Sequence, residues 1–199
     1  PKPSSAASDV YKRQDIKNQK VHSDLKDFFE FYVDYYFKIV DREFRKVFPN
    51  HLYLGCRLYE KTHGNKIVRK IASKYCDVLS FNVYKYSISD FDFFKNLNKP
   101  VIIGEFHFGT GTHGVWGTGL RVAYNLEQQA ELYKQFVYEA SINPAIIGAH
   151  WFQWTDQPAT GRFDGENFRI GFVSITDQPY ENLVNATKHI NSNLLEWRK

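Results

Sequence analysis

The sequence has 199 residues, of which 43% are hydrophobic and 24% are charged. This length suits one domain with a sizeable core, and the composition excludes a disordered or low-complexity chain. The apolar runs fall short of the roughly 20 residues of a membrane-spanning helix. The formal net charge of +4 is spread along the chain, so it does not indicate a nucleic-acid binder.

Residues 1–14 are expected to contribute no function. The stretch from Ser8 to Gln14 resembles translated adapter sequence, and no apolar core of a signal peptide precedes it. The segment is therefore either a non-native leader or an ordinary disordered terminus. Residues 15–199 are expected to form one partial catalytic domain.

Hydrophobic periodicity predicts a long helix over residues 23–48, with Ser23 as its N-cap and Pro49 as its stop. A turn and a short helix are expected over 88–98. The other elements alternate along the chain: buried strands over 52–58, 78–84, 100–106 and 145–152, and helices over 66–75, 125–141 and 180–195.

Continuous apolar strands separated by helices indicate an α/β fold with a parallel sheet that is buried on both faces. Four such units amount to the C-terminal half of a (β/α)₈ barrel, about strands 5–8, truncated at the N-terminus. A flavodoxin-like open sheet is the alternative. The barrel is favoured because polar and aromatic residues gather at the C-terminal end of every predicted strand.

Catalytic groups of a barrel lie at these strand ends, and Glu105 is the strongest candidate. It closes the apolar run Val101 to Gly104, so a rigid strand would hold its carboxylate at the mouth. If Glu105 acts on a glycoside, hydrolysis needs a second carboxyl group. The other candidates are assigned to substrate binding, with the three loop acids also open as acid/base: Arg57, Asn82, Tyr84, His107, His150, Trp151, Gln153, Trp154, Asp156, Asp164 and Glu166.

Neither a metal nor another cofactor is expected. His107 and His150 lack a third ligand at a recognisable spacing, so hydrogen bonding is their expected role. One of Trp151 and Trp154 is expected to pack in the core and the other to stack on substrate. Cys56 and Cys76 are expected at opposite ends of the barrel, too far apart for a disulfide.

Two stretches resemble glycoside hydrolase family 50, the β-agarases of the clan A barrels. The stretch from Ile102 to Gly109, IIGEFHFG, resembles the family's nucleophile strand. The stretch from His150 to Val173, which begins HWFQWTDQ, resembles its eighth strand and following loop. The segments Leu54–Arg57 and Ser80–Tyr84 are similar to its fifth and sixth strands. The resemblance covers about residues 50–190.

The resemblance implies a retaining hydrolase that cleaves β-1,4 bonds of agarose, with Glu105 as the nucleophile. The family's acid/base lies on a strand that would precede residue 23, so this chain alone would be inactive. The alternatives are a related barrel acting on porphyran or another galactan, and a non-catalytic carbohydrate-binding barrel. The implied partner is a polysaccharide, with no nucleic acid and no membrane span. The implied location is secreted, periplasmic or on the cell surface.

Overall fold

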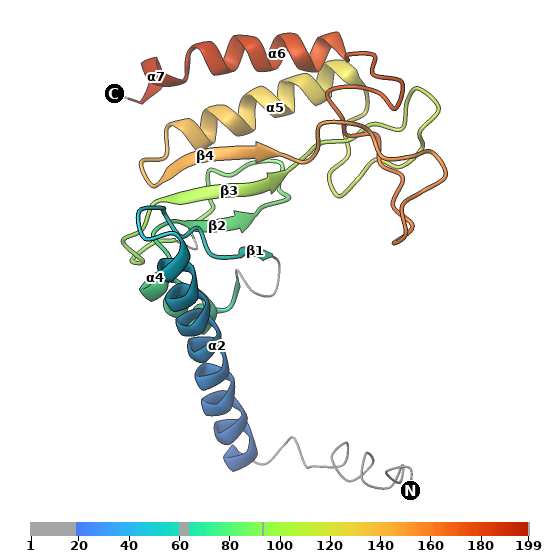
Figure 1. Ribbon diagram of the computed structural model, residues 1–199. Coiled ribbons are helices and arrows are strands. Elements are labelled where there is room, and N and C mark those ends of the chain that lie inside the picture. The colour runs from blue at the N-terminus through green and yellow to red at the C-terminus, as the bar shows by residue number, and fades with distance from the viewer. Residues whose placement is uncertain (1–18, 60–63, 93, 199) are drawn as a thin grey trace, which may run out of the picture.

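Four parallel strands, paired in the order in which they occur along the chain, form the sheet of the computed structural model, which describes residues 19–59, 64–92 and 94–198 (Figure 1). They are β1 (Arg57–Tyr59), β2 (Leu79–Asn82), β3 (Val101–Phe106) and β4 (Ile146–Trp151). Each strand pairs in parallel with the next. The expected α/β fold with a parallel sheet is therefore confirmed. A flavodoxin-like sheet would instead place its strands out of chain order.

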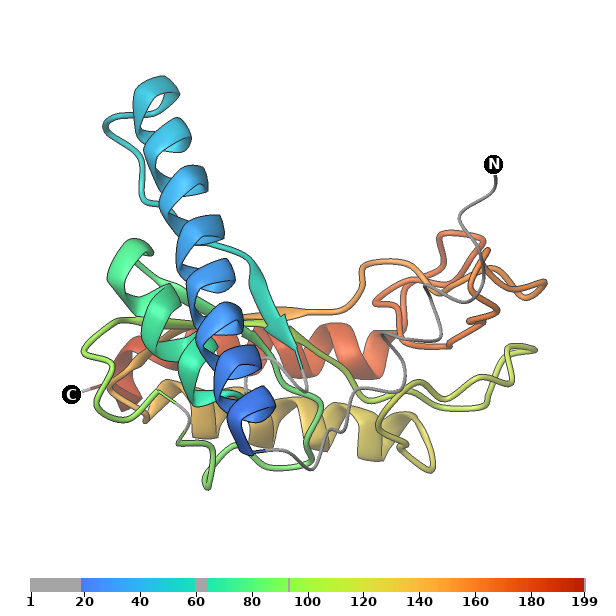
Figure 2. The ribbon, with the colours of Figure 1, turned by 90° about the horizontal axis from the view of Figure 1, so that it is seen from below.

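The helices of the described residues are α2 (Gln19–Val47), α4 (Lys66–Tyr75), α5 (Leu126–Ser141), α6 (Glu181–Ser192) and α7 (Leu194–Trp197). In Figure 1, α5 and α6 run side by side above β4, while α2 and α4 lie together beside β1. The view from below in Figure 2 shows the same two helix pairs. Asn65 and Asn125 cap α4 and α5, because each side chain accepts hydrogen bonds from backbone N–H groups of the first turn.

The core lies between the sheet and these helices. Strand residues such as Leu79, Phe81 and Ile103 are at most 1% exposed, and they pack in one cluster with Ile71 of α4 and Phe136 of α5. The flat stacking of Phe106 on Phe136, 4.2 Å between ring centroids, fixes β3 against α5. Burying these aliphatic and aromatic groups supplies the main favourable contribution to folding.

Three predicted elements differ from the structure. The first helix begins at Gln19, so Ser23 lies inside it and is not its N-cap. The described part of 88–98 forms turns and contains no helix. The first strand covers only residues 57–59, because Gly55 with φ +66° interrupts the extended backbone ahead of it.

The expectation for the two cysteines was also wrong. Cys56 precedes β1 and Cys76 precedes β2, so both lie at the N-terminal end of the sheet. A Cβ added to Gly55, the neighbour of Cys56, would lie 2.5 Å from the Cys76 Sγ. Both thiols are free, and burial raises the pKa of Cys76 to about 12. Cys76 is therefore a packing residue of the core.

None of the described helices has the length and apolar character needed to cross a membrane. The leader expected over residues 1–14 lies outside the described residues.

Candidate active site

A group of polar side chains meets at the C-terminal ends of β1, β2 and β3. Gly104 makes room for it: a Cβ at this position would lie 2.6 Å from Ser80 Oγ, 2.9 Å from Asn82 Oδ1 and 3.1 Å from Arg57 Cδ. Gly104 is therefore required by the close approach of three side chains from the neighbouring strands. Asn82 is buried, and its Oδ1 has no hydrogen-bond partner among the described residues.

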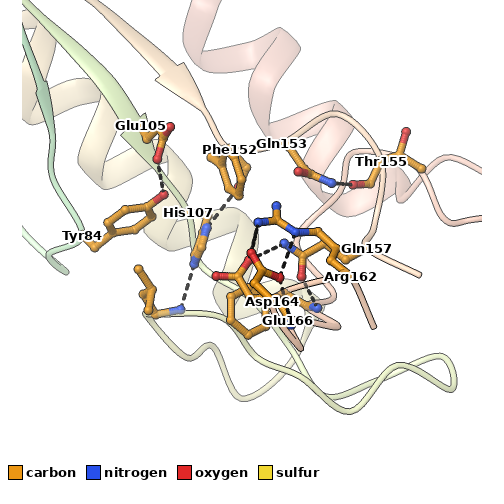
Figure 3. A network of polar contacts seen from close by, with 12 residues as sticks. Tyr84, Glu105, His107, Phe152, Gln153, Thr155, Gln157, Arg162, Asp164 and Glu166 are labelled. Carbon is orange, nitrogen blue, oxygen red and sulfur yellow. Dashed lines mark hydrogen bonds and ion pairs between the residues drawn. The ribbon is translucent and has the colours of Figure 1, made fainter. Parts of the chain in front are cut away.

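Glu105 occupies the centre of this group, and each of its carboxylate oxygens accepts a hydrogen bond. Arg57 Nη1 donates to Oε1 over 2.8 Å. The Tyr84 hydroxyl donates to Oε2 over 2.7 Å, as Figure 3 shows. Burial, and then the bond to Glu105, raise the pKa of Tyr84, which therefore remains a protonated donor. The carboxylate is thus oriented by two strands while its side chain stays 19% exposed.

The carboxylate faces a cleft of about 320 Å³. Arg162 and Glu166 approach this cleft from the long loop that follows β4. Its lining combines aromatic surface with carboxylate, amide and guanidinium groups, which is the mixture that suits a sugar ring and its hydroxyls. The lining residues are Tyr59, Asn82, Tyr84, Glu105, His107, Leu120, Phe152, Arg162, Glu166 and Phe168.

His107 joins three parts of the site. It is 1% exposed; its Nδ1 lies 3.1 Å from the Phe152 carbonyl oxygen, and its Nε2 accepts from the Leu120 N–H over 2.8 Å (Figure 3). These partners define a neutral ring that donates through Nδ1 and accepts through Nε2. Burial lowers its pKa to about 4. Both ring nitrogens are therefore engaged with the backbone, and the ring contacts Tyr84 at 4.7 Å between centroids.

The loop after β4 carries a second group of charges. Gln157, which is fully buried, donates from Nε2 to Glu166 Oε2 over 2.7 Å, while its Oε1 accepts from the Phe168 N–H. Arg162 forms an ion pair with Asp164 and lies 3.5 Å from Glu166 Oε2 (Figure 3). This pairing lowers the pKa of Asp164. The loop therefore presents Glu166 to the cleft, whereas Asp164 neutralises Arg162.

Other predicted site residues lie outside the cleft. Trp151 donates from its indole N–H to the Ile170 carbonyl over 2.7 Å, and its ring packs on Phe106, so it is the core member of the tryptophan pair. Trp154 is 69% exposed, which leaves its ring open to stack on a ligand.

Asp156, 4% exposed, accepts from the Gly171 N–H and from the Tyr180 hydroxyl, each over 2.6 Å. Both oxygens are bonded inside the fold, and this buried carboxylate does not line the cleft. His150 is exposed on β4 and does not line the cleft, and Gln153 donates to the Thr155 carbonyl over 2.8 Å.

Several residues that line the cleft are not among the candidates that the sequence predicts. Arg162 stands two and four residues before Asp164 and Glu166, and this alternation of charge within the loop was the available signal. Tyr59, Leu120 and Phe168 carry no pattern that separates them from packing residues. The described residues contain no group of three or more histidine, cysteine or acidic side chains that could hold a metal ion.

Comparison with known proteins identifies relatives over most of the chain. Beta-agarase B of Vibrio sp. (strain JT0107) is 41% identical over 189 residues, and Beta-agarase A of the same strain is 38% identical over 164 residues. No family model matches. The chain spans only 20% and 16% of the length of these two relatives.

Solved structures of agarases also resemble this chain. An exo-β-agarase superposes with a TM-score of 0.85 at 40% identity, covering 91% of this chain and 25% of that one. The agarase AgWH50C gives 0.84 at 38% identity, covering 92% of this chain and 26% of that one. A third structure, BpGH50, gives 0.74 at 23% identity, covers 86% of this chain and 37% of that one, and shows likeness of fold alone.

Proposed function

We propose that the chain, a relative of the β-agarases of glycoside hydrolase family 50, is the nucleophile-bearing segment of a retaining agarase. The observation that carries this proposal is the placement of Glu105. It is the penultimate residue of β3, both oxygens are oriented by Arg57 and Tyr84, and it faces a cleft rich in aromatic and hydrogen-bonding groups.

In this proposal a carboxylate oxygen of Glu105 attacks the anomeric carbon of a galactose unit. The bond from that carbon to the glycosidic oxygen breaks, and an acid supplies a proton to the departing oxygen. Water, deprotonated by the same group acting as base, then releases the sugar from Glu105. Each Glu105 oxygen has lone pairs beyond the one that accepts from Arg57 or Tyr84, so either remains able to attack.

The acid/base is assigned to a strand outside this chain. Glu166 is the loop carboxylate that lines the cleft. Because Gln157 and Arg162 both bind it, we assign it to positioning of the substrate. We also propose that the four sequential parallel strands are the C-terminal half of a (β/α)₈ barrel, whose missing strands would pair with the free edges of β1 and β4. The 199-residue chain alone is then expected to be inactive on agarose. In this proposal the longer enzyme acts outside the cell.

Replacement of Glu105 tests the assignment in the longer enzyme that contains this segment. Glu105→Gln should lower turnover of agarose by at least about 10³-fold, because the amide cannot form the glycosyl intermediate. With Glu105→Ala, added azide should restore bond cleavage from the vacated space and yield a glycosyl azide of inverted anomeric configuration. Glu166→Gln is the matched control and should yield no such product. Full turnover by Glu105→Gln would contradict the proposal.

The substrate is tested by comparing reducing-end release from agarose, porphyran and a plant galactan. Fastest release from agarose is expected. Retention of the protein in an agarose affinity gel without any sugar release would favour a carbohydrate-binding protein instead.

A further inference from the structure

A second hollow adjoins the cleft that Glu105 lines. It measures about 230 Å³ and shares the side chains of Tyr59, Asn82, Tyr84 and Leu120 with the cleft. Its remaining lining residues are Val83, Lys85, Phe91 and Arg121. Because the two spaces share these side chains, a sugar chain with one residue over Glu105 can place its next residue in this hollow.

The two spaces differ in charge. The cleft contains the carboxylates of Glu105 and Glu166 beside the cation of Arg162, whereas the charged groups that line the hollow are the cations of Lys85 and Arg121. Among the described residues Arg121 forms no ion pair, and its Nη1 donates to the Leu120 carbonyl oxygen over 2.6 Å. Its positive charge also contributes to the lowered pKa of His107, after the larger effect of burial.

Lys85 is only loosely neutralised. Its Nζ lies 3.3 Å from Asp90 Oδ1, but the two side chains are 41% and 75% exposed, so water screens the pair. Asp90 does not line the hollow. An anion placed between Lys85 and Arg121 would thus meet two cations and no carboxylate of the lining.

The hollow also has an unused acceptor. Asn82 is 8% exposed, and its Oδ1 is the one buried side-chain oxygen without a hydrogen-bond partner in the described part of the chain. A buried acceptor without a partner is unfavourable unless a ligand or water supplies a donor. A sugar hydroxyl is such a donor, and both spaces share this residue.

We propose that the hollow is a subsite for a galactan residue that carries a sulfate half-ester, with Arg121 and Lys85 binding the sulfate and Asn82 Oδ1 accepting from a ring hydroxyl. The planar guanidinium of Arg121 matches two oxygens of such an oxyanion. This inference rests on the proposed function, which places the sugar chain in the cleft over Glu105.

The test is a binding comparison on the 199-residue chain. One probe is a galactan tetrasaccharide with a single sulfate ester, and the other is the same tetrasaccharide after desulfation. The sulfated probe should bind about tenfold more tightly at low salt. This preference should disappear in Arg121→Gln, fall in Lys85→Gln, and weaken as salt screens the charges. Near-ultraviolet circular dichroism checks that each variant is folded.

Arg42→Gln is the matched control, since it removes one positive charge from the exposed face of α2. It should leave the preference unchanged. Equal binding of the two probes, no binding of the sulfated probe by the folded chain, or an equal loss in Arg42→Gln and Arg121→Gln would each overturn the inference. Failure of the proposed function is read separately, as absence of galactan hydrolysis by the longer enzyme.

Discussion

Two groups of the same composition, a carboxylate, an arginine and a tyrosine, occur in different parts of the molecule. At the strand ends, Glu105 accepts from Arg57 and Tyr84. In the loop after β4, Asp156 accepts from Tyr180 and from a backbone N–H, and the guanidinium of Arg169 lies 3.5 Å from the centroid of the Tyr180 ring.

The groups differ in exposure and in what surrounds them. Arg169 is fully buried and Asp156 is 4% exposed, and a fully buried Gln129 joins Arg169 to the Phe108 carbonyl. Burial raises the pKa of Tyr180 to about 12 and lowers that of Arg169. Around Glu105, in contrast, the arginine side chain is 51% exposed and a cleft is open. The same residue types therefore stabilise the fold in one place and present a carboxylate to an open cleft in the other.

Exchanging the carboxylates for amides should separate these roles most strongly. In the longer enzyme, Asp156→Asn should lower the free energy of unfolding by about 3 kcal/mol, because one of two buried donors loses its acceptor near a buried guanidinium. Glu105→Gln should change it by about 1 kcal/mol or less, since water screens Arg57. Urea denaturation measures the first effect and agarose turnover the second.

The two variants should rank in opposite order for loss of stability and for loss of turnover. The folded fraction of Asp156→Asn should keep most of its turnover, whereas Glu105→Gln should lose at least about 10³-fold. Comparable stability losses in both variants would mean that the two groups do not differ as their exposure indicates.

His107 lies beside Tyr84 in the cleft and should make stability depend on pH. Its folded pKa of about 4 lies below the ordinary value, so the unfolded chain binds the proton more readily. Stability is therefore fully present above about pH 6.5, and roughly 3 kcal/mol of it is lost as pH falls to about 4. The measurement is urea denaturation across this window, compared with His107→Gln.

The variant has no imidazole to protonate, so its unfolding free energy should vary less with pH between 4 and 6.5. Parallel pH curves for the two proteins would show that the proton on His107 does not oppose the fold.

Local patterns predicted the elements better than the site. The helix over 66–75 and the strand over 101–106 follow directly from periodic and continuous apolar residues. Asp156 and Glu166 illustrate what was inaccessible, because both are acids of one loop and only one faces the cleft. Their directions depend on pairings such as Thr155 with Val173, which join segments distant in the sequence. Arg169 likewise meets Gln129 across 40 positions.

Two glycines give the smallest and most selective test of the link through His107. Gly119 and Gly165 have φ angles of +71° and +86°, so alanine is strained at either position. Only Gly119 is also crowded, since a Cβ there would lie 2.5 Å from His107 Nε2, whereas nothing lies within 4 Å of one at Gly165.

Gly165→Ala should therefore cost about 1 kcal/mol of stability, and Gly119→Ala about 1 kcal/mol more. The additional cost comes from displacing the imidazole or the Leu120 N–H that it accepts from. Combining Gly119→Ala with His107→Gln should remove much of the extra cost, because the amide side chain can move away. Urea denaturation of the wild type, the two single variants at Gly119 and His107 and their combination forms a double-mutant cycle, and additive costs would show that the crowding at Gly119 does not act through His107.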